Sequence, residues 1–472
     1  MTASRRRFLR SIAALPGALV LFPGDTGLRA GAAVLSRASI PSRASLGFAD
    51  PSLQWRGDSS VTSALRLGDR LPADRPPVGT LPLKAPFDWE AVGMALRQRF
   101  RDLRRHFVFE YYPWYRRDPW GHWDEADRVP PFDIASNYFP LLGPYDSHDS
   151  SVIERHAEWI AGAGVGAINV SWWGRDDYTD RAVPLIMDVM RAHGIHVTFH
   201  LEPYTDRRAD TYAKDILYLI QEYGDRRHWD CFLLLEDAAG RSGPVFKSFR
   251  TILPRTVTDC HGMTFPVPDY TGDEAWRRAT DTVRLELRGK FDHVTLLADS
   301  LDFTRTRAAG FDGIAIYDNY VEPALWPRFA ADCGPDLVFS FNSNPGFDGI
   351  EARRVAPDSC YRPPRRVPDD DLIDWGSSFG AMQAARASAS RIRDTLQATL
   401  RLQTDPALTN ARKGFFLAYI NSFNEWHEGH QFEPMRNSAD LRPQERALNY
   451  RNPPAGSYRM RALGEALRQV TG

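Results

Sequence analysis

Runs of apolar, strand-like residues alternate with amphipathic, helix-like runs along most of this 472-residue chain. This alternation predicts a parallel sheet whose strands are joined by helical crossovers. Eight strand-like runs can be counted, and eight is the number that closes a β/α barrel. They span 106–114, 167–173, 196–203, 244–249, 293–298, 313–317, 337–342 and 415–423. We therefore expect an α/β protein with a single (β/α)8 TIM-type barrel.

Helix-like runs lie between these strands and after the last one. They span 151–163, 182–193, 211–223, 274–288, 324–332, 380–402 and 458–470. The fourth and fifth strands are the least well defined, because residues 231–236 also have the pattern of a strand and could replace one of them.

The N-terminus has the features of an export signal. A twin-arginine pattern at Ser4–Arg10 precedes a moderately apolar run, and the small residues Ala30–Ala33 suit cleavage. The apolar run contains Pro16 and Gly17 and is too short to span a membrane. We expect residues 1–33 to direct twin-arginine export to the periplasm or the exterior, without stable membrane insertion.

The segment that follows differs from the rest of the chain. Residues 34–86 are rich in Ser, Arg, Pro, Gly and Ala and have no sustained periodicity, which predicts a poorly ordered linker. Residues 87–472 then form the barrel domain.

Charge and aromatic content favour a neutral ligand. The formal net charge is -1, and the body of the chain has no basic run, so the electrostatic signature of a nucleic-acid binder is missing. The 13 tryptophans exceed what a core of this size needs, and aromatic faces suit the C–H faces of sugar rings. We expect an oligo- or polysaccharide substrate, no nucleic acid, and a monomer.

The cysteines are not arranged for chemistry. Cys231, Cys260, Cys333 and Cys360 lie far apart with no CxxC pair, which argues against zinc or thiol redox chemistry. In an oxidising compartment one or two disulfides are compatible with this spacing, but the sequence does not select a pairing.

Polar and aromatic residues follow the predicted strands, where the catalytic face of a barrel lies. These segments are Glu110–Tyr112, Ser171–Trp173, His200–Tyr204, Tyr317–Tyr320, Asn342–Asn344 and Asn424–Gly429. His200 and Glu202 alternate along one strand and therefore point the same way, whereas Trp172 and Trp173 point to opposite faces. His122 and Trp123 fall in a loop after the first strand and could cap the cleft.

Two carboxylates three positions apart, Glu425 and Glu428, follow the last strand in the stretch FFLAYINSFNEWHEGHQFEP. Glycoside cleavage needs one protonated and one ionised carboxyl group. In a helical turn the two Cβ atoms would lie about 5–6 Å apart, so that each charge raises the pKa of the other carboxyl. This spacing predicts a catalytic pair of the retaining type. The alternative is a pair of solvated loop charges.

The neighbouring histidines do not form a metal motif. The stretch from His427 to His430 lacks the HExxH spacing that places two imidazoles on one helical face, so we expect no metal. These imidazoles are better suited to hydrogen bonds with substrate or with the carboxylates.

An ordered set of segments resembles glycoside hydrolase family 99, the endo-acting α-mannosidases and α-mannanases. The matching pieces are YYPWY, GHWDE, NYFPLLGPYDSHDSSVIERH, INVSWWG, HVTFHLEPY, GFDGIAIYD and NSFNEWHEGHQFEP, over roughly residues 106–434. The resemblance implies a retaining endo-glycosidase on a β/α barrel that needs no cofactor. It also implies that Glu425 removes the proton of the substrate's own 2-hydroxyl, giving a 1,2-anhydro sugar. Glu428 would be the acid and then the base.

The resemblance also implies substrate contacts at Tyr112, Trp173, His200, Glu202, Tyr204 and Asn424. Trp173 is similar to the mannan-preferring bacterial type, where animal relatives have Tyr. With the residues named above, the candidate substrate-binding set is Tyr112, His122, Trp123, Trp173, His200, Glu202, Tyr204, Asn424, Trp426 and His427.

Two departures from the family pattern leave the substrate open. His430 stands where relatives usually have Thr, and the fourth strand offers Lys247, Phe249 and Arg250 where relatives end in a Tyr-Asp-Ser-Tyr type sequence. Besides cleavage of internal α-mannosidic bonds of the α-1,2 type, two alternatives remain. One is hydrolysis of another α-linked glycan, such as a glucan or envelope polysaccharide, and the other is a non-catalytic carbohydrate-binding barrel.

Overall fold

The computed structural model describes residues 86–204, 209–267, 269–319, 321–355, 361, 366–368, 373–374 and 377–472. The predicted export signal (1–33) and all but the last residue of the predicted linker (34–86) lie outside the described residues.

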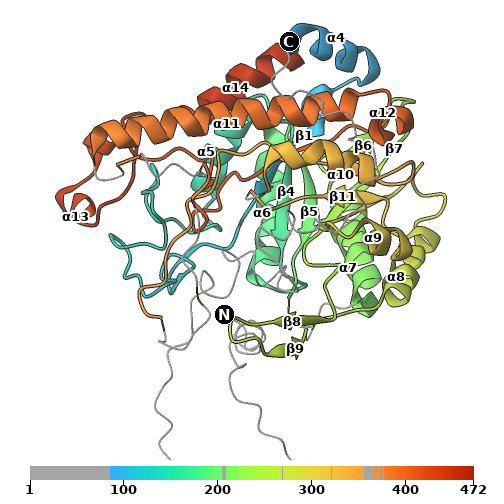
Figure 1. Ribbon diagram of the computed structural model, residues 1–472, viewed down its shortest axis with the longest axis horizontal. Coiled ribbons are helices and arrows are strands. Elements are labelled where there is room, and N and C mark those ends of the chain that lie inside the picture. The colour runs from blue at the N-terminus through green and yellow to red at the C-terminus, as the bar shows by residue number, and fades with distance from the viewer. Residues whose placement is uncertain are drawn as a thin grey trace, which may run out of the picture.

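Eight parallel strands form a nearly closed barrel, as the sequence predicts (Figure 1). The strands follow the order β12-β11-β10-β7-β5-β4-β1-β13, and a parallel bridge between Ser343 and Ile420 joins the two ends of the sheet. Their bounds are β1 Phe107–Tyr111, β4 Ala167–Trp172, β5 His196–Leu201, β7 Ser242–Ser248, β10 Thr295–Ala298, β11 Gly313–Ala315, β12 Val338–Ser340 and β13 Ala418–Ile420. Each lies within or overlaps one of the eight predicted runs.

The ambiguous run at 231–236 does not displace a barrel strand. Its end forms β6, Leu234–Glu236, which pairs antiparallel with β7 outside the main path of the sheet. Both strands of the predicted barrel that were in doubt, β7 and β10, are therefore present.

Helices surround the barrel at the predicted places. They are α5 Ser150–Gly162, α6 Tyr178–Ala192, α7 Ala209–Leu219, α8 Asp273–Glu286, α10 Trp326–Asp332, α11 Ser378–Thr404 and α14 Tyr458–Thr471. Short polar side chains begin several of them: Asp149 caps α5, Asp177 caps α6 and Ser377 caps α11, each by accepting from a backbone N–H of the first turn. The predicted boundaries hold to within a few residues.

Further short elements decorate the barrel. The helices are α4 Trp89–Arg99, α9 Phe303–Ala308, α12 Thr409–Lys413 and α13 Pro443–Arg446, and a π-helical turn at Ile220–Asp225 extends α7. Two antiparallel pairs, β2 Arg116–Arg117 with β3 Trp120–Gly121 and β8 Thr256–Thr258 with β9 Thr264–Pro266, lie outside the barrel sheet. The long helix α11 packs against α14, which in turn packs against α4 (Figure 1).

The apolar residues divide into layers that explain this arrangement. The largest core cluster lies between the strands and the helices and includes Ile168, Phe199 and Leu296. A second, aromatic cluster joins the segments that follow β1, β4 and β13; its members include Tyr112, Trp114, Tyr115, Trp123, Trp173 and Trp426. We call it the mouth aromatic cluster. Because it consists largely of rigid rings, it fixes the loops on the side of the barrel where the strands end.

The cysteines are consistent with one disulfide. Cys260 is disulfide-bonded, whereas Cys231 and Cys333 are free and buried. Cys360 lies outside the described residues. None of the helices within the described part of the chain has the length and apolarity that crossing a membrane requires.

Candidate active site

Glu425 and Glu428 lie just beyond β13, as predicted, but the segment that carries them is a turn and not a helix. Residues Trp426–Gly429 form the turn, and the Gly429 N–H donates to the carbonyl oxygen of Trp426 at 3.3 Å. Gly429 has φ +65°, and a Cβ on it would lie 2.2 Å from the Asp348 carbonyl oxygen. Only glycine fits there, so the turn depends on this residue.

Glu428 is held through one of its two carboxylate oxygens. The Tyr317 hydroxyl donates to Oε2 at 2.9 Å, and Nε2 of His430 lies 2.6 Å from the same atom. The side chain is only 5% exposed. Both contacts therefore involve Oε2, on a carboxyl group that is almost fully enclosed by protein.

Glu425 has different partners. Its backbone N–H donates to the Ser422 hydroxyl at 2.8 Å, and its Oε1 lies 3.4 Å from Nδ1 of His427. The Nε2 of His427 lies 2.7 Å from the His122 carbonyl oxygen. A carbonyl oxygen can only accept, so Nε2 must carry a hydrogen, and this contact fixes the orientation of the ring beside Glu425.

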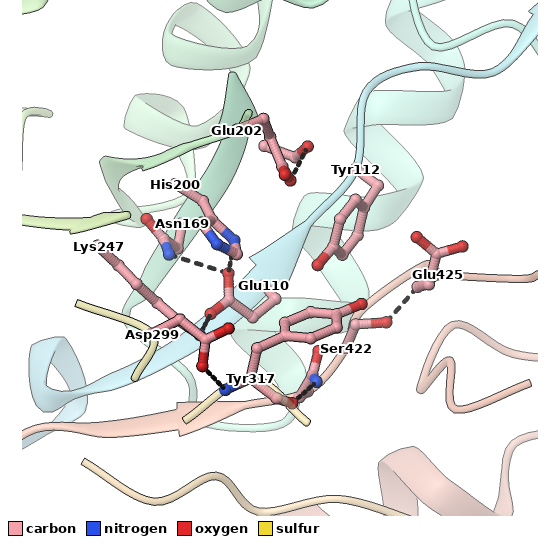
Figure 2. Close-up of polar contacts among 12 residues, drawn as sticks. Glu110, Tyr112, Asn169, His200, Glu202, Lys247, Asp299, Tyr317, Ser422 and Glu425 are labelled. Atoms are coloured by element: carbon pink, nitrogen blue, oxygen red, sulfur yellow. Dashed lines mark hydrogen bonds and ion pairs between the residues drawn. The ribbon is translucent and has the colours of Figure 1, made fainter. Parts of the chain in front are cut away.

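Two tyrosines, Tyr112 and Tyr317, lie between Glu425 and Glu110 (Figure 2). Burial, the Glu428 charge and the Glu425 charge raise the pKa of Tyr317 well above its ordinary value. Burial, together with the charges of Glu110, Glu202 and Glu425, does the same to the pKa of Tyr112. Both hydroxyls therefore stay protonated and face several carboxylates at once, which shows that these acidic groups converge on one site.

A fully buried ionic cluster forms the floor of the site (Figure 2). Glu110, at the end of β1, accepts from Lys247 Nζ at 2.6 Å, from Asn169 Nδ2 at 2.9 Å and from His200 Nδ1 at 3.1 Å. Burial acts to raise the pKa of Glu110, but the Lys247 ammonium and then His200 outweigh it and lower the pKa to about 2. We call Glu110, Asn169, His200 and Lys247 the floor cluster.

The floor cluster accounts for Lys247, one of the residues at which the fourth barrel strand departs from the family pattern. Lys247 is fully buried and paired with Glu110, so its charge is compensated inside the protein. Phe249, two residues further along, packs against the rings of His200 and Tyr317 at 5.8 and 5.2 Å. Arg250, by contrast, is half-buried and lies beyond the strand.

The remaining predicted residues after β4 and β5 lie at the same end of the barrel. Glu202 accepts from the Ser171 hydroxyl at 2.7 Å, and the Trp173 indole donates to the same hydroxyl at 3.1 Å. Trp172 points the other way and donates to Asp180 of α6, as the alternation of the strand predicts. The Tyr204 hydroxyl donates to Asp215 of α7.

Three predicted substrate-binding residues lie in the core and hold the site from behind. The Asn424 side chain accepts from the Tyr112 N–H at 2.7 Å and donates to the Tyr112 carbonyl at 3.0 Å, which ties the end of β1 to the segment that carries Glu425. Trp123 and Trp426 are fully buried in the mouth aromatic cluster, and their indoles donate to the Tyr145 carbonyl and to Glu433. We assign them a supporting role, and a direct sugar contact by these three residues remains only a prediction.

His122, Glu125 and His427 form the one group of described residues whose side-chain atoms approach a metal-ligand arrangement, within 4.8 Å of one another. Their contacts are already accounted for within the protein. His122 Nδ1 lies 2.8 Å from Glu125 Oε1, and His427 is bound to the His122 carbonyl. We assign no metal to this group.

A small pocket lies beside the turn at Trp426–Gly429. Its lining includes Gly429, Asp348 and Arg459, but neither Glu425 nor Glu428. The Asp348 N–H donates to the Glu428 carbonyl oxygen at 2.9 Å, so the pocket and the site share this backbone.

Part of this chain is similar in sequence to proteins that have already been classified. The sequence model described as glycosyl hydrolase family 99 matches residues 103–232, which include β1, β4 and β5. The mouse glycoprotein endo-alpha-1,2-mannosidase is 27% identical over 356 residues, which cover 68% of this chain and 66% of the mouse protein. Over residues 103–232 the chain is therefore similar to glycosyl hydrolase family 99.

Two further proteins are similar to this chain. The Xenopus laevis glycoprotein endo-alpha-1,2-mannosidase is 32% identical over 162 residues, 29% of this chain and 35% of that protein. The solved structure of the endo-alpha-mannosidase from Bacteroides thetaiotaomicron in complex with BIS-TRIS-propane matches with a TM-score of 0.54 at 22% identity. The match covers 78% of this chain and 97% of that one and supports the barrel fold. This chain spans just under two thirds of the length of the mouse protein.

Sequence reasoning missed several residues of the site. Glu110 was seen only as part of a strand end, although a single acid within the apolar run FVFEY is a signal that its side chain has a buried partner. The contact of Tyr317 with Glu428 joins residues that are far apart in the sequence, and the contact of His122 with Glu125 depends on the shape of a loop, so the sequence pattern predicts neither. Lys247 has no role in the sequence-based prediction, whereas the predicted contact of an imidazole with a carboxylate is found between His430 and Glu428.

Proposed function

We propose that this protein is an exported, retaining, endo-acting glycoside hydrolase that cleaves internal α-mannosidic bonds of mannan or mannose-rich glycans, of the α-1,2 type. The observation that carries the proposal is the pair Glu425 and Glu428, which lie on one turn beyond the last barrel strand with different partners. Differently surrounded carboxyls can take different protonation states, which is what an acid and a base require. The similar mouse and Xenopus laevis proteins are named endo-alpha-1,2-mannosidases, which supports the substrate class.

In the first step Glu425 takes the proton of the sugar's 2-hydroxyl. The oxygen at C2 then attacks C1 of the same ring, the bond from C1 to the glycosidic oxygen breaks, and Glu428 gives its proton to that leaving oxygen. The product at the enzyme is a 1,2-anhydro sugar.

In the second step Glu428, now ionised, takes a proton from water as the water attacks C1. The three-membered ring opens, and Glu425 returns its proton to the oxygen at C2. Two inversions at C1 leave the anomeric configuration unchanged, which makes the enzyme retaining.

The first test removes the acid. A good general acid or base raises the rate by roughly 10² to 10⁴-fold. Glu428→Gln should therefore lower kcat by roughly 10²-fold or more, while glycan binding stays intact. The measurement is turnover of yeast α-mannan together with the binding of a mannan fragment by calorimetry. Turnover near the wild-type value would exclude Glu428 as the acid.

The second test concerns the base. A substrate analogue that lacks the 2-hydroxyl should bind but not turn over, because Glu425 would have no proton to remove. Normal turnover of this analogue would instead favour direct attack by a carboxylate on C1.

The substrate itself is tested with a panel of glycans. Incubation with yeast α-mannan and with α-glucans, followed by sizing of the products, should show internal cleavage of mannan. Products from another glycan only would favour that hydrolase activity, and binding without products would favour a carbohydrate-binding barrel. The pairing of Lys247 inside the floor cluster gives no reason to prefer an anionic glycan.

Export and monomeric state belong to the same proposal. The twin-arginine pattern at Ser4–Arg10 supports export, and the disulfide at Cys260 fits an oxidising compartment. Replacing Arg5, Arg6 and Arg7 with Lys should retain the protein in the cytoplasm, as fractionation of cells expressing it would measure. Light scattering after size exclusion checks for a monomer of the mature chain.

A further inference from the structure

Residues 422–433 form a loop whose two ends are joined by backbone hydrogen bonds. The Phe432 N–H donates to the Ser422 carbonyl oxygen at 2.8 Å, and the Glu433 N–H donates to the Phe423 carbonyl oxygen at 2.7 Å. We call these residues the carboxylate loop, because they include both acids of the proposed mechanism. The ends of the loop are therefore fixed, and the position of each acid depends on what holds the residues between the ends.

The side chain of Glu433 binds back to the middle of this loop. Glu433 is fully buried, and its Oε2 accepts from the Trp426 indole at 2.9 Å and from the Tyr145 hydroxyl at 2.7 Å. Burial, and then the Glu433 charge, raise the pKa of Tyr145 well above its ordinary value. The Tyr145 hydroxyl therefore keeps its proton and donates it to this hydrogen bond.

Tyr145 continues the connection to a second residue of the loop. The Asn424 side chain donates to the Tyr145 hydroxyl oxygen at 3.1 Å. Asn424 and Trp426 are the two neighbours of Glu425 in the chain. One oxygen of Glu433 is thus bound to one neighbour directly and to the other through a single hydroxyl group.

Glu433 has little ionic compensation. Within the part of the chain that the structure describes, its one ion-pair contact is His156 Nε2 of α5, at 3.4 Å, and its Oε1 makes no hydrogen bond to any described residue. A buried carboxylate is costly unless hydrogen bonds hold it. Its two donors, Trp426 and Tyr145, are therefore its principal contacts, and losing the carboxylate would leave both donors unpaired.

We propose that Glu433 is a positioning residue that holds Glu425 in place relative to Glu428 and the substrate. It acts through Trp426 and through the Tyr145 hydroxyl, without touching the substrate. Proton transfer requires heavy atoms about 2.6–3.2 Å apart, and a misplacement of about 1 Å can lower the rate by about 10²-fold. The inference rests on the proposed roles of Glu425 and Glu428.

The experiment compares Glu433→Gln with Glu433→Met on α-mannan. The glutamine oxygen can still accept from both donors, whereas methionine fills a similar space and its sulfur is only a weak acceptor. We expect kcat to fall by about tenfold to hundredfold in Glu433→Met and to stay within about threefold of wild type in Glu433→Gln. KM should change less than kcat, because Glu433 makes no hydrogen bond to the described sugar-contact candidates that follow β4 and β5. Wild-type kcat in Glu433→Met, or equal losses in both variants, would overturn the inference.

Tyr145→Phe is a milder variant that tests the connection through Asn424. It keeps the ring in the mouth aromatic cluster and leaves the bond between Trp426 and Glu433 intact. Because it removes only the hydroxyl, kcat should fall by about threefold to tenfold. An unchanged kcat would overturn the connection through Asn424.

Asp180→Leu is the matched control. Asp180 of α6 is also a buried acid that accepts from an indole and a tyrosine hydroxyl, those of Trp172 and Tyr223, at 2.7 Å each. It lies on a helix outside the barrel and has no contact with the carboxylate loop among the described hydrogen bonds. Its loss should lower the midpoint of thermal unfolding and leave kcat unchanged. A fall in kcat as large as in Glu433→Met would show a general response to losing a buried acid and would overturn the inference.

A second measurement needs no turnover. Crystal structures of the wild type, Glu433→Gln and Glu433→Met should show the Glu425 carboxyl group displaced relative to Glu428 by about 1 Å or more in Glu433→Met alone. The same positions in all three structures would contradict the role given to Glu433. If the wild type cleaves no glycan at all, the proposed function fails, while these structures still show whether Glu433 positions Glu425.

Discussion

At the scale of single residues, the site depends on buried charges that compensate one another. Glu110 would be costly in the barrel interior without Lys247, His200 and Asn169, each of which donates to its carboxylate. The Lys247 ammonium also lies over the rings of Tyr317 and Tyr419, at 5.4 and 4.7 Å. Its position is therefore fixed by charge and by packing together.

Removing the cation alone should be strongly destabilising. Lys247→Met leaves the buried Glu110 carboxylate without its strongest partner, and the expected loss is about 3–5 kcal/mol of unfolding free energy. Urea unfolding measures it. Adding Glu110→Gln should restore part of the loss, because the uncompensated charge disappears.

Lys290→Met is the control for this prediction. Lys290 pairs with Asp225 at the surface, where its side chain is 34% exposed, so its removal should cost less than about 1 kcal/mol. Equal losses for Lys247→Met and Lys290→Met would contradict the role given to the floor cluster.

At the scale of elements, a turn that follows β13 presents both candidate catalytic carboxylates, Glu425 and Glu428. Its geometry is set by Gly429 against the Asp348 backbone and by Arg459 of α14, which binds the carbonyls of Gly429 and Gln431. Asn424 ties the same turn to β1. Three separate elements therefore hold the turn, and displacement of any one should move the carboxylates.

Gly429→Ala tests this dependence. The new Cβ would meet the Asp348 carbonyl oxygen at 2.2 Å in a backbone conformation that favours glycine, so the turn must shift. We expect kcat to fall by more than about tenfold, with a loss of about 1–3 kcal/mol in stability. Steady-state kinetics and urea unfolding measure the two effects.

Gly194→Ala serves as the comparison. Gly194 has a similar φ of +67°, but a Cβ there would have no atom within 4 Å, and it lies beyond α6, away from the site. It should cost about 1 kcal/mol and leave kcat unchanged. Wild-type kcat in Gly429→Ala would show that the turn tolerates the shift.

At the scale of the whole molecule, buried titratable groups make the fold sensitive to acid. His106, before β1, lies 2.7 Å from the Phe416 carbonyl oxygen through Nδ1, and burial lowers its pKa from 6.5 to about 4. The unfolded chain therefore binds a proton at His106 between these two values when the folded chain does not. Stability is complete above pH 6.5 and is lost as the pH falls toward 4. Glu110 acts with the same sign at lower pH, between 4.5 and about 2.

The unfolding free energy should therefore fall by about 3 kcal/mol between pH 7 and pH 4 on account of His106, since each pKa unit is worth about 1.4 kcal/mol. Urea unfolding at pH 7, 5.5 and 4 measures this. The variant His106→Asn keeps a donor near the position of Nδ1 but takes up no proton. In it, the part of the fall in unfolding free energy that comes from His106 should be lost. An unchanged pH dependence in the variant would show that other groups are responsible.

The sequence by itself determined the barrel, its eight strands and the place of the pair Glu425 and Glu428 after the last strand, because these follow from local hydrophobic periodicity and from where strands end. It also separated Trp172 from Trp173, since neighbouring residues on a strand point to opposite faces. The floor cluster and the contacts Tyr317–Glu428 and Glu425–His427 were decided only by tertiary structure. They join residues from different strands and loops, or depend on the form of a turn, and a local pattern does not encode such distances. For the same reason Trp123, Asn424 and Trp426, which resemble sugar-binding residues in sequence, are found in the core that supports the site.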